Sequence, residues 1–480
     1  MKGVPLFLAA LLAGCSFAPK YTQPPVETPG AFKEGWKTAE PKDDAIRGNW
    51  WEALGDANLN ALEDQVNVSN QTVAAAFANF LAARAVVKQN RSEFFPIVGT
   101  SPSVTRTRQS ATRNFSSSGK TFTEYSLPLD ASWEPDLWGR VRNTVKASSL
   151  EAQATLADLE NVRLTVHAEL AVDYFQVRAL DEQKRLLDEA VVAYQESLKL
   201  TQVRHETGLA SDQDVAQAET QLNTTQAQAT DLAIQRAQFE HAIALLIGKP
   251  ASTFSLAVQP LETKPVPVPT GVPSDLFERR PDIAAAERRV AGANAQIGVA
   301  RAAYFPAVTL TASAGYQGSS LGDLISYPNF LWSLGGTVAE TLLDFGKRKG
   351  VTEQAWAQYG ATVANYRQTV LTAFQEVEDN LSALRLLAQE LEQQDAAVNS
   401  SRRYLTLAQD RYKLGIDSFL NVIIAQTSLL NNQRTAVNVR LQQVSATVQL
   451  IKALGGGWDN SQVSSANGLA KKAPPPGTRE

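Results

Sequence analysis

The longest regular pattern along the chain is helical. Residues 141–207 contain neither proline nor glycine, and a continuous helix of that length would be a rod of roughly 100 Å. Between Val177 and Leu198 the apolar positions alternate three and four residues apart, as in the seam of a coiled coil, with only Lys184 out of character. Alanine is abundant on the other faces of these helices. It permits close packing on a second face, which favours the wall of a helical cylinder. An isolated coiled coil is the alternative.

Strict alternation of apolar and polar residues predicts β-strands. Tyr125 to Trp133 and Val308 to Tyr316 each place apolar side chains on one face and polar or small ones on the other. Such a strand can face lipid on one side and water on the other, although a soluble, half-buried sheet shows the same pattern. We expect four strands, which cannot close a barrel, because the smallest bacterial barrels need about eight. Several chains would have to contribute, and three would give twelve strands.

The two halves of the chain repeat one order of elements. Four landmarks recur in sequence: Phe95-Pro96 at Phe305-Pro306, 210 positions later, and, all 207 positions later, Leu137-Trp138-Gly139-Arg140 at Asp344-Phe345-Gly346-Lys347, Gly208 at Gly415 and Gly248 at Gly455. Repetition at nearly constant separation predicts a duplicated unit of helix, two strands, a very long helix and a shorter helix.

The predicted parts follow from this duplication. In chain order they are a signal peptide (1–14), an extended, lipidated segment (15–56), a first repeat (57–259, strands about 97–133, helices about 57–92 and 141–247), a Pro-rich linker (260–273), a second repeat (274–456, strands about 307–343, helices about 281–303 and 347–454) and a disordered tail (457–480).

Composition excludes several classes of function. With 45 basic and 49 acidic residues the formal net charge is −4, so nucleic acid is not expected as a partner. Three histidines, one cysteine and one methionine leave little for a metal site, a disulfide framework or thiol chemistry, and no cofactor is expected. No catalytic or phosphate-binding motif is found, so an enzyme is the least favoured class.

The amino terminus indicates export. Lys2 precedes an apolar stretch that ends in Leu12-Ala13-Gly14-Cys15, which is too short to span a bilayer as a helix and is typical of a signal sequence. Small residues directly before the single cysteine resemble the lipobox of bacterial lipoproteins, in which Cys15 would be lipidated and become the first mature residue. The following Ser16 is then consistent with passage to the outer membrane. A buried thiol within an ordinary cleaved signal is the alternative.

The turns that close the two helical hairpins share the pattern R-x-x-x-G-x-x-S. It comprises Arg204, Gly208 and Ser211 in the first repeat and Arg411, Gly415 and Ser418 in the second. Helix capping explains the glycines and serines, because glycine tolerates the left-handed C′ position and serine can cap the next helix. It does not require the arginines, although a basic group near a helix C-terminus is mildly favourable.

With the lipobox, the Phe-Pro motifs, the Gly139 and Gly346 turns and the two tip motifs, the chain resembles the outer-membrane efflux protein family of the TolC-like superfamily, in its OprM- and NodT-like lipoprotein branch. The resemblance covers nearly the whole mature chain. It implies a mixed fold, α-helical plus membrane β, in which a homotrimer forms a twelve-stranded β-barrel in the outer membrane that continues into a periplasmic α-helical coiled-coil barrel.

The same resemblance implies partners and a site. The hairpin tips would dock on a periplasmic adaptor protein that links the duct to an inner-membrane pump of the RND type, and the tip-motif residues are the candidates for this contact. Just beyond the second tip the sequence departs from the TolC pattern, because Asn421 and Ile424 match the positions of acidic rings. Asp417 resembles an aspartate of the lipoprotein branch and is our candidate for the aperture, where three like charges would favour cations; a solvated residue before the next helix is the alternative. Tyr412 matches a position that ties inner to outer helices through hydrogen bonds.

Three functions are open at this point. The leading hypothesis is a passive outer-membrane exit duct for drugs or other small toxic solutes, opened and powered by its partners. The exit duct of a type I protein-secretion system would share every motif. A structural lipoprotein that spans the periplasm without conducting is the third.

Overall fold

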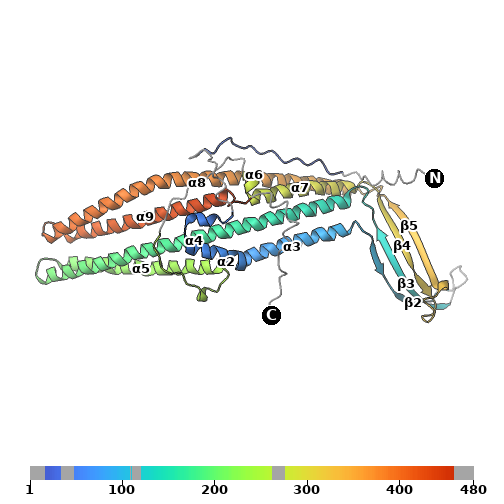
Figure 1. The fold of residues 1–480 in the computed structure, drawn as a ribbon, viewed down its shortest axis with the longest axis horizontal. Helices are drawn as coiled ribbons and strands as arrows, with labels where there is room; N and C mark the ends of the chain where they lie inside the picture. The colour runs from blue at the N-terminus through green and yellow to red at the C-terminus, as the bar shows by residue number, and fades with distance from the viewer. Residues whose placement is uncertain (1–16, 34–47, 109, 111–119, 262–275, 459–480) are drawn as a thin grey trace. The chain divides into compact units, whose positions relative to one another are not determined.

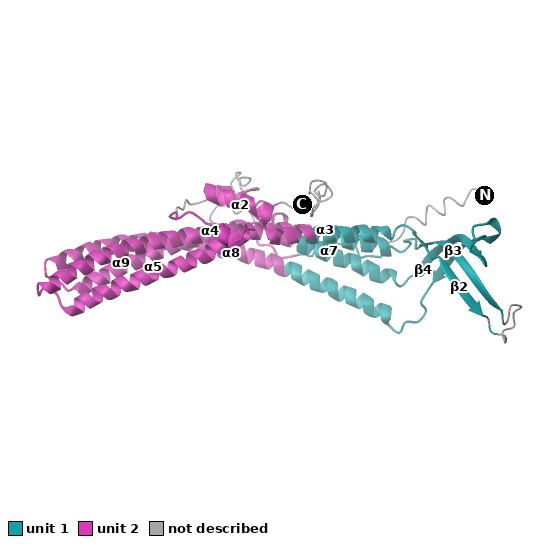
Figure 2. Ribbon diagram, turned by 90° about the horizontal axis from the view of Figure 1, so that it is seen from below, with its two compact units in different colours: residues 1–25, 79–155, 285–367 teal, residues 26–78, 156–284, 368–480 magenta. Residues whose placement is uncertain are grey.

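The computed structural model describes residues 17–33, 48–108, 110, 120–261 and 276–458. Its chain divides into two compact units, coloured separately in Figure 2. Unit 1 comprises Met1–Pro25, Asn79–Thr155 and Ala285–Arg367, and unit 2 comprises Val26–Ala78, Leu156–Ala284 and Gln368–Glu480. The predicted signal peptide, Cys15 and most of the Pro-rich linker and C-terminal tail lie outside the described residues.

The described elements confirm the duplicated order (Figure 1). The first copy contains α2 (Ala57–Ser69), α3 (Gln71–Ser92), β1 (Ile97–Thr100), β2 (Ser103–Arg108), β3 (Thr121–Trp133), α4 (Arg140–Glu206) and α5 (Asp212–Leu246); the second contains α6 (Leu276–Arg279), α7 (Pro281–Ala302), β4 (Ala307–Gly318), β5 (Phe330–Ala339), α8 (Lys347–Lys413) and α9 (Phe419–Ala453). Short 3₁₀ helices are η2 (Trp50–Leu54), η3 (Ala251–Thr253) and η5 (Tyr327–Asn329). None of the described helices has an apolar stretch long enough to cross a bilayer.

The first predicted helix, 57–92, is wrong as a single element, because the chain breaks at Asn70. Asn70 has extended backbone angles, and its side-chain oxygen accepts a hydrogen bond from the Val73 N–H at 2.9 Å while its Nδ2 donates to the Leu246 carbonyl at 2.7 Å. A buried asparagine thus ends α2 and caps α3. These two hydrogen bonds stabilise the extended backbone at Asn70, so α2 ends there.

Strand boundaries also differ from the prediction. Pro102 separates β1 from β2, because proline has no N–H to give to the ladder. β5 ends at Ala339 rather than 343, and the residues that follow bind Arg348 instead of a strand: the Arg348 guanidinium donates to Glu340 at 3.0 Å and to the Thr341 carbonyl at 2.7 Å.

Both terminal segments contain more structure than predicted. Within the segment predicted to be extended, η2 places Trp50 and Trp51 in the core. At the other end, Trp458 belongs to the predicted disordered tail, yet it is buried and its backbone N–H donates to the Gly455 carbonyl at 3.1 Å. Burial of large aromatic side chains fixes these segments.

Unit 1 contains one antiparallel sheet with the order β1/β2–β3–β4–β5. β1 and β2 pair with the same edge of β3 in one continuous register, so they occupy one strand position. Leu129 lies opposite Ala314, which lies opposite Trp332, whereas Asp130 lies opposite Ser313 and accepts a hydrogen bond from its hydroxyl at 2.7 Å. One face of the sheet is therefore largely apolar and the other polar, as the alternation predicts.

Aromatic residues join the amino-terminal segment to the start of β4 in unit 1. The Phe17 ring stacks on Phe305 with centroids 4.2 Å apart, and Trp138 also stacks on Phe305, at 5.0 Å. Further along, Tyr21 donates to Glu287 at 2.5 Å. Burial, and then this hydrogen bond, raise the Tyr21 pKa. The segment after the predicted lipid site is thus held against α7.

The helix ends in unit 2 show the duplication at atomic detail. Asn70 donates to the carbonyl of Leu246, and Arg280 donates to that of Ala453 at 2.9 Å. These donors are 210 positions apart and the acceptors 207, the same two separations found in the sequence landmarks. Each repeat therefore fixes the end of its shorter helix with the residue that follows α2 or α6, although the residue type differs.

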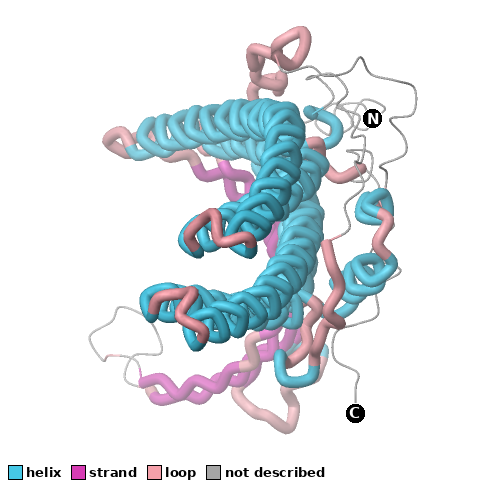
Figure 3. Tube along the Cα trace, turned by 90° about the vertical axis from the view of Figure 1, so that its left-hand side faces the viewer, coloured by secondary structure: helices cyan, strands magenta, loops and turns pink. Residues whose placement is uncertain are grey.

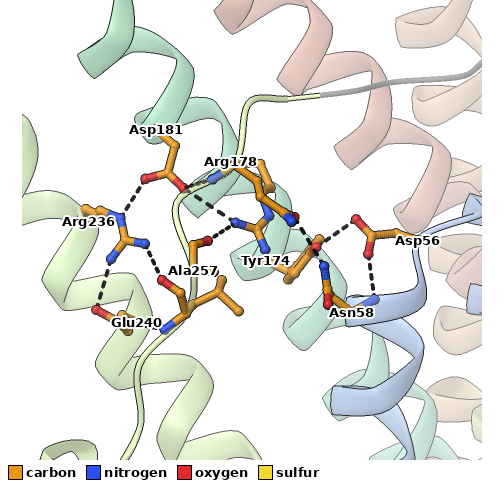
Figure 4. A network of polar contacts seen from close by, with 10 residues as sticks. Asp56, Asn58, Tyr174, Arg178, Asp181, Arg236, Glu240 and Ala257 are labelled. Carbon is orange, nitrogen blue, oxygen red and sulfur yellow. Dashed lines mark hydrogen bonds and ion pairs between the residues drawn. The ribbon is translucent and has the colours of Figure 1, made fainter. Parts of the chain in front are cut away.

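A buried polar network fastens the segment after η3 to the helices of the first repeat (Figure 4). Asp181 accepts hydrogen bonds from Arg236 at 2.6 Å and from the Gln259 N–H at 3.1 Å, and Arg178 donates to the Ala257 carbonyl at 2.6 Å. The Asp181 and Arg178 side chains are almost fully buried. Buried charges with this many partners hold a segment without regular structure in place.

A second part of this network reaches α2 (Figure 4). The Tyr174 hydroxyl donates to Asp56 at 2.7 Å, while Asp56 also accepts from the backbone N–H groups of Asn58 and Leu59 and caps α2. Burial and this hydrogen bond raise the pKa of Tyr174 to about 12. One aspartate therefore serves both the helix and its packing against α4.

Glu63 and His167 form a buried pair between α2 and α4. Glu63 Oε2 lies 2.6 Å from His167 Nδ1, His167 Nε2 lies 3.3 Å from Asn67 Oδ1, and the Trp51 ring stacks on the imidazole. Because Asn67 Oδ1 can only accept, Nε2 carries the proton and Nδ1 accepts from a protonated Glu63. Burial raises the Glu63 pKa to about 9 and lowers the His167 pKa to about 4, which agrees with a neutral pair.

This pair predicts a pH dependence of stability. Above pH of about 7 the histidine is neutral in both states, so only Glu63 matters: the folded chain holds a proton that the unfolded chain has lost. Its folded pKa is raised, so its contribution is lost as pH rises toward about 9. We expect Glu63→Gln, which can still donate to His167, to abolish this decline in unfolding temperature between pH 7 and 9. Glu196→Gln, at an exposed position of α4, is the control, and an unchanged decline in Glu63→Gln would contradict the assignment.

Candidate functional site

The two hairpin tips end in the same backbone structure. Gly208 and Gly415 have φ of +75° and +73°. In the first tip the N–H of Leu209 donates to the Arg204 carbonyl at 2.7 Å, and in the second Ile416 donates to the Arg411 carbonyl at 3.0 Å. Both are Schellman motifs, in which a glycine adopts the left-handed conformation that other residues avoid. Figure 3 shows the two turns end-on.

The next helices begin differently in the two tips. Ser211 forms a complete capping box with Asp214. Ser418 occupies the equivalent N-cap position, but its side chain makes no capping bond. Instead the Asp417 carboxylate accepts from the Ser418 N–H at 2.9 Å. The expectation that serine can cap both helices is therefore correct in the first repeat and wrong in the second.

The paired arginines also differ. The guanidinium of Arg204 crosses to the other hairpin, where Nη1 donates to the Tyr412 carbonyl at 3.1 Å and the guanidinium carbon lies 4.6 Å from the centre of the Tyr412 ring. Arg411 stays within its own tip and pairs with Asp417, with Nε 3.2 Å from Oδ2. The structure thus joins a residue predicted for docking, Arg204, to one predicted for the aperture, Tyr412.

Asp417 and Asn421 are adjacent, as expected from their spacing. Asn421 Nδ2 lies 2.5 Å from the Asp417 carboxylate. This hydrogen bond, those from Arg411 and the Ser418 N–H, and the charge of Arg411 lower the pKa of Asp417. The carboxylate therefore stays ionised, and in this chain it is compensated by a cation in the same turn.

A small apolar cluster lies beneath these polar contacts. Tyr412, Phe419, Val422 and Ala425 from the second hairpin pack with Ala218 of the first. The Tyr412 hydroxyl is buried and has no hydrogen-bond partner among the described residues. Sequence reasoning missed Phe419 and Val422, whose only signal was their spacing of three residues in the apolar first turn of α9.

Gly208, Ser211, Gly415, Ser418 and Arg411 are exposed at the tips. A Cβ atom placed on either tip glycine would have no neighbour within 4 Å among the other residues. These residues are accessible to a partner, whereas Arg204 is half-buried against Tyr412. Within the described ranges, no group of three histidine, cysteine or acidic residues could hold a metal ion.

A sheet with one apolar and one polar face, together with long helical hairpins in a duplicated chain, defines an outer-membrane channel with a helical duct. Comparison with known proteins agrees. Residues 62–249 and 272–456 match the sequence model of the outer membrane efflux protein family, and the chain belongs to this family.

Two relatives and one solved structure illustrate the similarity. The chain is 33% identical to the solvent efflux pump outer membrane protein SrpC of Pseudomonas putida, over 96% of this chain and 99% of that protein. It is 32% identical to the pyoverdine export outer membrane protein OpmQ of Pseudomonas aeruginosa, over 98% and 99%. The CmeC outer membrane channel of Campylobacter jejuni superposes with a TM-score of 0.89 at 25% identity, covering 95% of this chain and 98% of that one. The protein is an efflux channel of the outer membrane.

Proposed function

We propose that the protein is the passive exit duct of a tripartite efflux system and exports drugs, solvents or other small toxic molecules. In this proposal it assembles as a homotrimer, and its hairpin tips bind a periplasmic adaptor that connects it to an RND-type inner-membrane pump. The observation that carries the proposal is the sheet of unit 1, which combines an apolar and a polar face with two open edges. The solvent efflux pump named for SrpC supports small molecules as cargo.

The number of strand positions supports assembly from several copies, and the family resemblance sets their number at three. β1/β2, β3, β4 and β5 give four positions per chain, and four cannot close a barrel. Three copies give twelve. A closed barrel satisfies every backbone polar group within the bilayer, which an open sheet cannot do.

A lipid at Cys15 would add a second attachment to the membrane. Phe17, two residues further on, stacks on Phe305 directly before β4. This contact supports a lipid anchor near the ends of the strands.

At the tips we separate two roles. Gly208, Ser211, Arg411, Gly415 and Ser418 are exposed and are proposed to contact the adaptor. Tyr412, Asp417 and Asn421 are proposed to shape the periplasmic aperture. Arg204 is proposed to act on the aperture rather than the adaptor, because it holds the Tyr412 backbone and ring from the other hairpin.

Conductance and export together test the proposed function. Purified protein in planar bilayers should form water-filled channels, and deletion of its gene should lower tolerance to solvents or drugs while secreted proteins stay unchanged. A lipoprotein that only spans the periplasm would give no conductance, even with Asp417→Ala. Loss of a secreted protein with unchanged tolerance to every compound would favour a type I secretion duct.

The Arg204–Tyr412 contact predicts a latch. Arg204→Ala removes a cation–π contact and a hydrogen bond, worth about 1–2 kcal/mol per protomer for the cation–π part. In each protomer the open fraction of the tips should rise roughly five- to thirty-fold, and the factors multiply in a trimer whose tips open together, so mean conductance in bilayers should rise by at least this much. Arg402→Ala is the control, since Arg402 is exposed on α8 and its guanidinium donates to Asn399 of the same helix. Equal conductance in both variants would exclude the latch.

Docking is tested at Gly415. Gly415→Trp adds a bulky side chain at an exposed tip and should abolish export while the trimer still assembles. Gly415→Ala carries the same backbone strain, because φ is +73°, but no bulk, so it should retain most export. The readouts are drug tolerance and co-purification with the adaptor. Full export by Gly415→Trp would remove this tip from the contact.

A further inference from the structure

Two arginines extend the apolar face of the sheet at the end away from α4. β1 and β2 pair with β3 in one register, so their even-numbered residues share a face with the odd-numbered residues of β3. On this face Val104 lies opposite Tyr125, and Arg106 and Arg108 follow Val104 along the strand. Leu129 belongs to the same face of β3. The arginines therefore lie on the apolar side of the sheet, which the proposed duct turns toward lipid.

The apolar face is nearly as tall as the hydrocarbon layer of an outer membrane. From Trp133 to Tyr125, β3 has eight steps, which at ~3.4 Å each and a tilt of about 40° rise roughly 21 Å. The apolar band of an outer-membrane barrel is about 25 Å tall. Arg106 lies two steps beyond Val104 and Arg108 four, so they are about 5 and 10 Å further along this axis. Arg106 is thus at the outer edge of the hydrocarbon, and Arg108 is outside it.

Aromatic rings mark the same boundary. Tyr316 lies opposite Phe330, with ring centroids 5.7 Å apart, and opposite Leu127 on its other side. Tyr125 lies two residues further out on β3. Aromatic residues gather where a barrel meets the membrane surface. The rings of β3, β4 and β5 therefore place this surface at the level at which the arginines begin on β2.

The chain supplies no counter-charge to the two guanidinium groups. The side chains of Arg106 and Arg108 are exposed, and among the described residues neither has a hydrogen-bond or ion-pair partner. Residues 101–123 include four basic residues and no acidic one, and Glu124 lies opposite Thr105 on the other face. The counter-ion must therefore come from outside the chain. At the surface of a membrane the available anion is phosphate, two oxygens of which fit one planar guanidinium.

We propose that Arg106 and Arg108 bind the phosphates of a glycolipid in the outer leaflet, whose acyl chains lie on the apolar face beside Val104 and Tyr125. The ligand class is that of lipopolysaccharide, an acylated sugar with phosphate groups, because its charges and chains match the order of arginines and apolar residues along the strand. Free phosphate would use only the arginines. The hairpin end faces the outer leaflet, because the opposite ends of the strands lead into helices that extend into the periplasm. The inference rests on the proposed duct and adds a lipid ligand to its barrel.

Binding of lipopolysaccharide to the full-length protein in detergent tests this site. Arg106→Gln with Arg108→Gln should bind fluorescent lipopolysaccharide several-fold more weakly than the wild type. Arg106→Lys with Arg108→Lys keeps both charges without the planar fork and should give an affinity between the two. The same glycolipid with its phosphates removed should bind to the wild type and to these variants alike.

Two matched controls separate a site from general charge attraction. Exchanging each arginine with the threonine before it (Thr105→Arg, Arg106→Thr, Thr107→Arg and Arg108→Thr) keeps composition and net charge but moves both guanidinium groups to the polar face. This variant should bind as weakly as the glutamine variant. Lys88→Gln with Arg91→Gln removes the same charge from exposed positions of α3 in unit 1 and should bind as the wild type does.

Conductance in planar bilayers, measured on the same preparations, shows that each variant is folded and separates this inference from the proposed function. Equal lipopolysaccharide affinity of a conducting wild type and its face-exchanged variant would overturn the lipid site and leave the duct standing. Arginine-dependent binding of inorganic phosphate without a preference for the glycolipid would also overturn it. A wild type that forms no channels would overturn the proposed duct itself.

Discussion

The structure depends on one constraint: backbone N–H and C=O groups in hydrocarbon have no water to bind, so a sheet there can have no open edge. The sheet of this chain has two, β5 and β1/β2. The chain is long enough for a more complete barrel, but it devotes most of its length to helices and provides four strand positions. Four strand positions are sufficient because the chain is duplicated. A repeat that pairs with the other repeat of its own chain can also pair with a repeat of another chain.

The repeats show which features the architecture requires and which were free to diverge. At the helix ends of unit 2, Asn70 donates a hydrogen bond to the Leu246 carbonyl, and Arg280 donates one to the Ala453 carbonyl. Each position therefore keeps a hydrogen-bond donor, although the residue type differs. At the tips both glycines keep their left-handed turns, but Arg204 binds the other hairpin and Arg411 binds its own. The two tips therefore share one turn but use the arginine that precedes it differently.

Sequence predicts the elements better than their interruptions. The absence of proline and glycine from 141–207 and the alternation in 125–133 are local properties, and they locate α4 and β3 closely. The break at Asn70 depends on a carbonyl 176 residues away, and the end of β5 on the guanidinium of Arg348. For the site, spacing predicts the turns and the neighbourhood of Asp417 and Asn421, whereas the contact of Arg204 with Tyr412 spans 208 residues. The sequence offered one indirect indication of this contact. Helix capping explains the glycines of the tip motifs, but it does not explain their arginines.

The strengths of the tip contacts suit a duct that partners must open. The Arg411–Asp417 pair is largely exposed, so solvent screens it and it adds little to closure. Arg204 on a buried Tyr412 is stronger, at about 1–2 kcal/mol for a partly desolvated cation–π contact. Three such contacts in the proposed trimer total roughly 3–6 kcal/mol, close to the ~5.5 kcal/mol that separates a 1:99 from a 99:1 population. Closure of this strength would keep the proposed aperture shut without a partner, and an adaptor bound, as proposed, through three pairs of tips would supply a comparable free energy to open it.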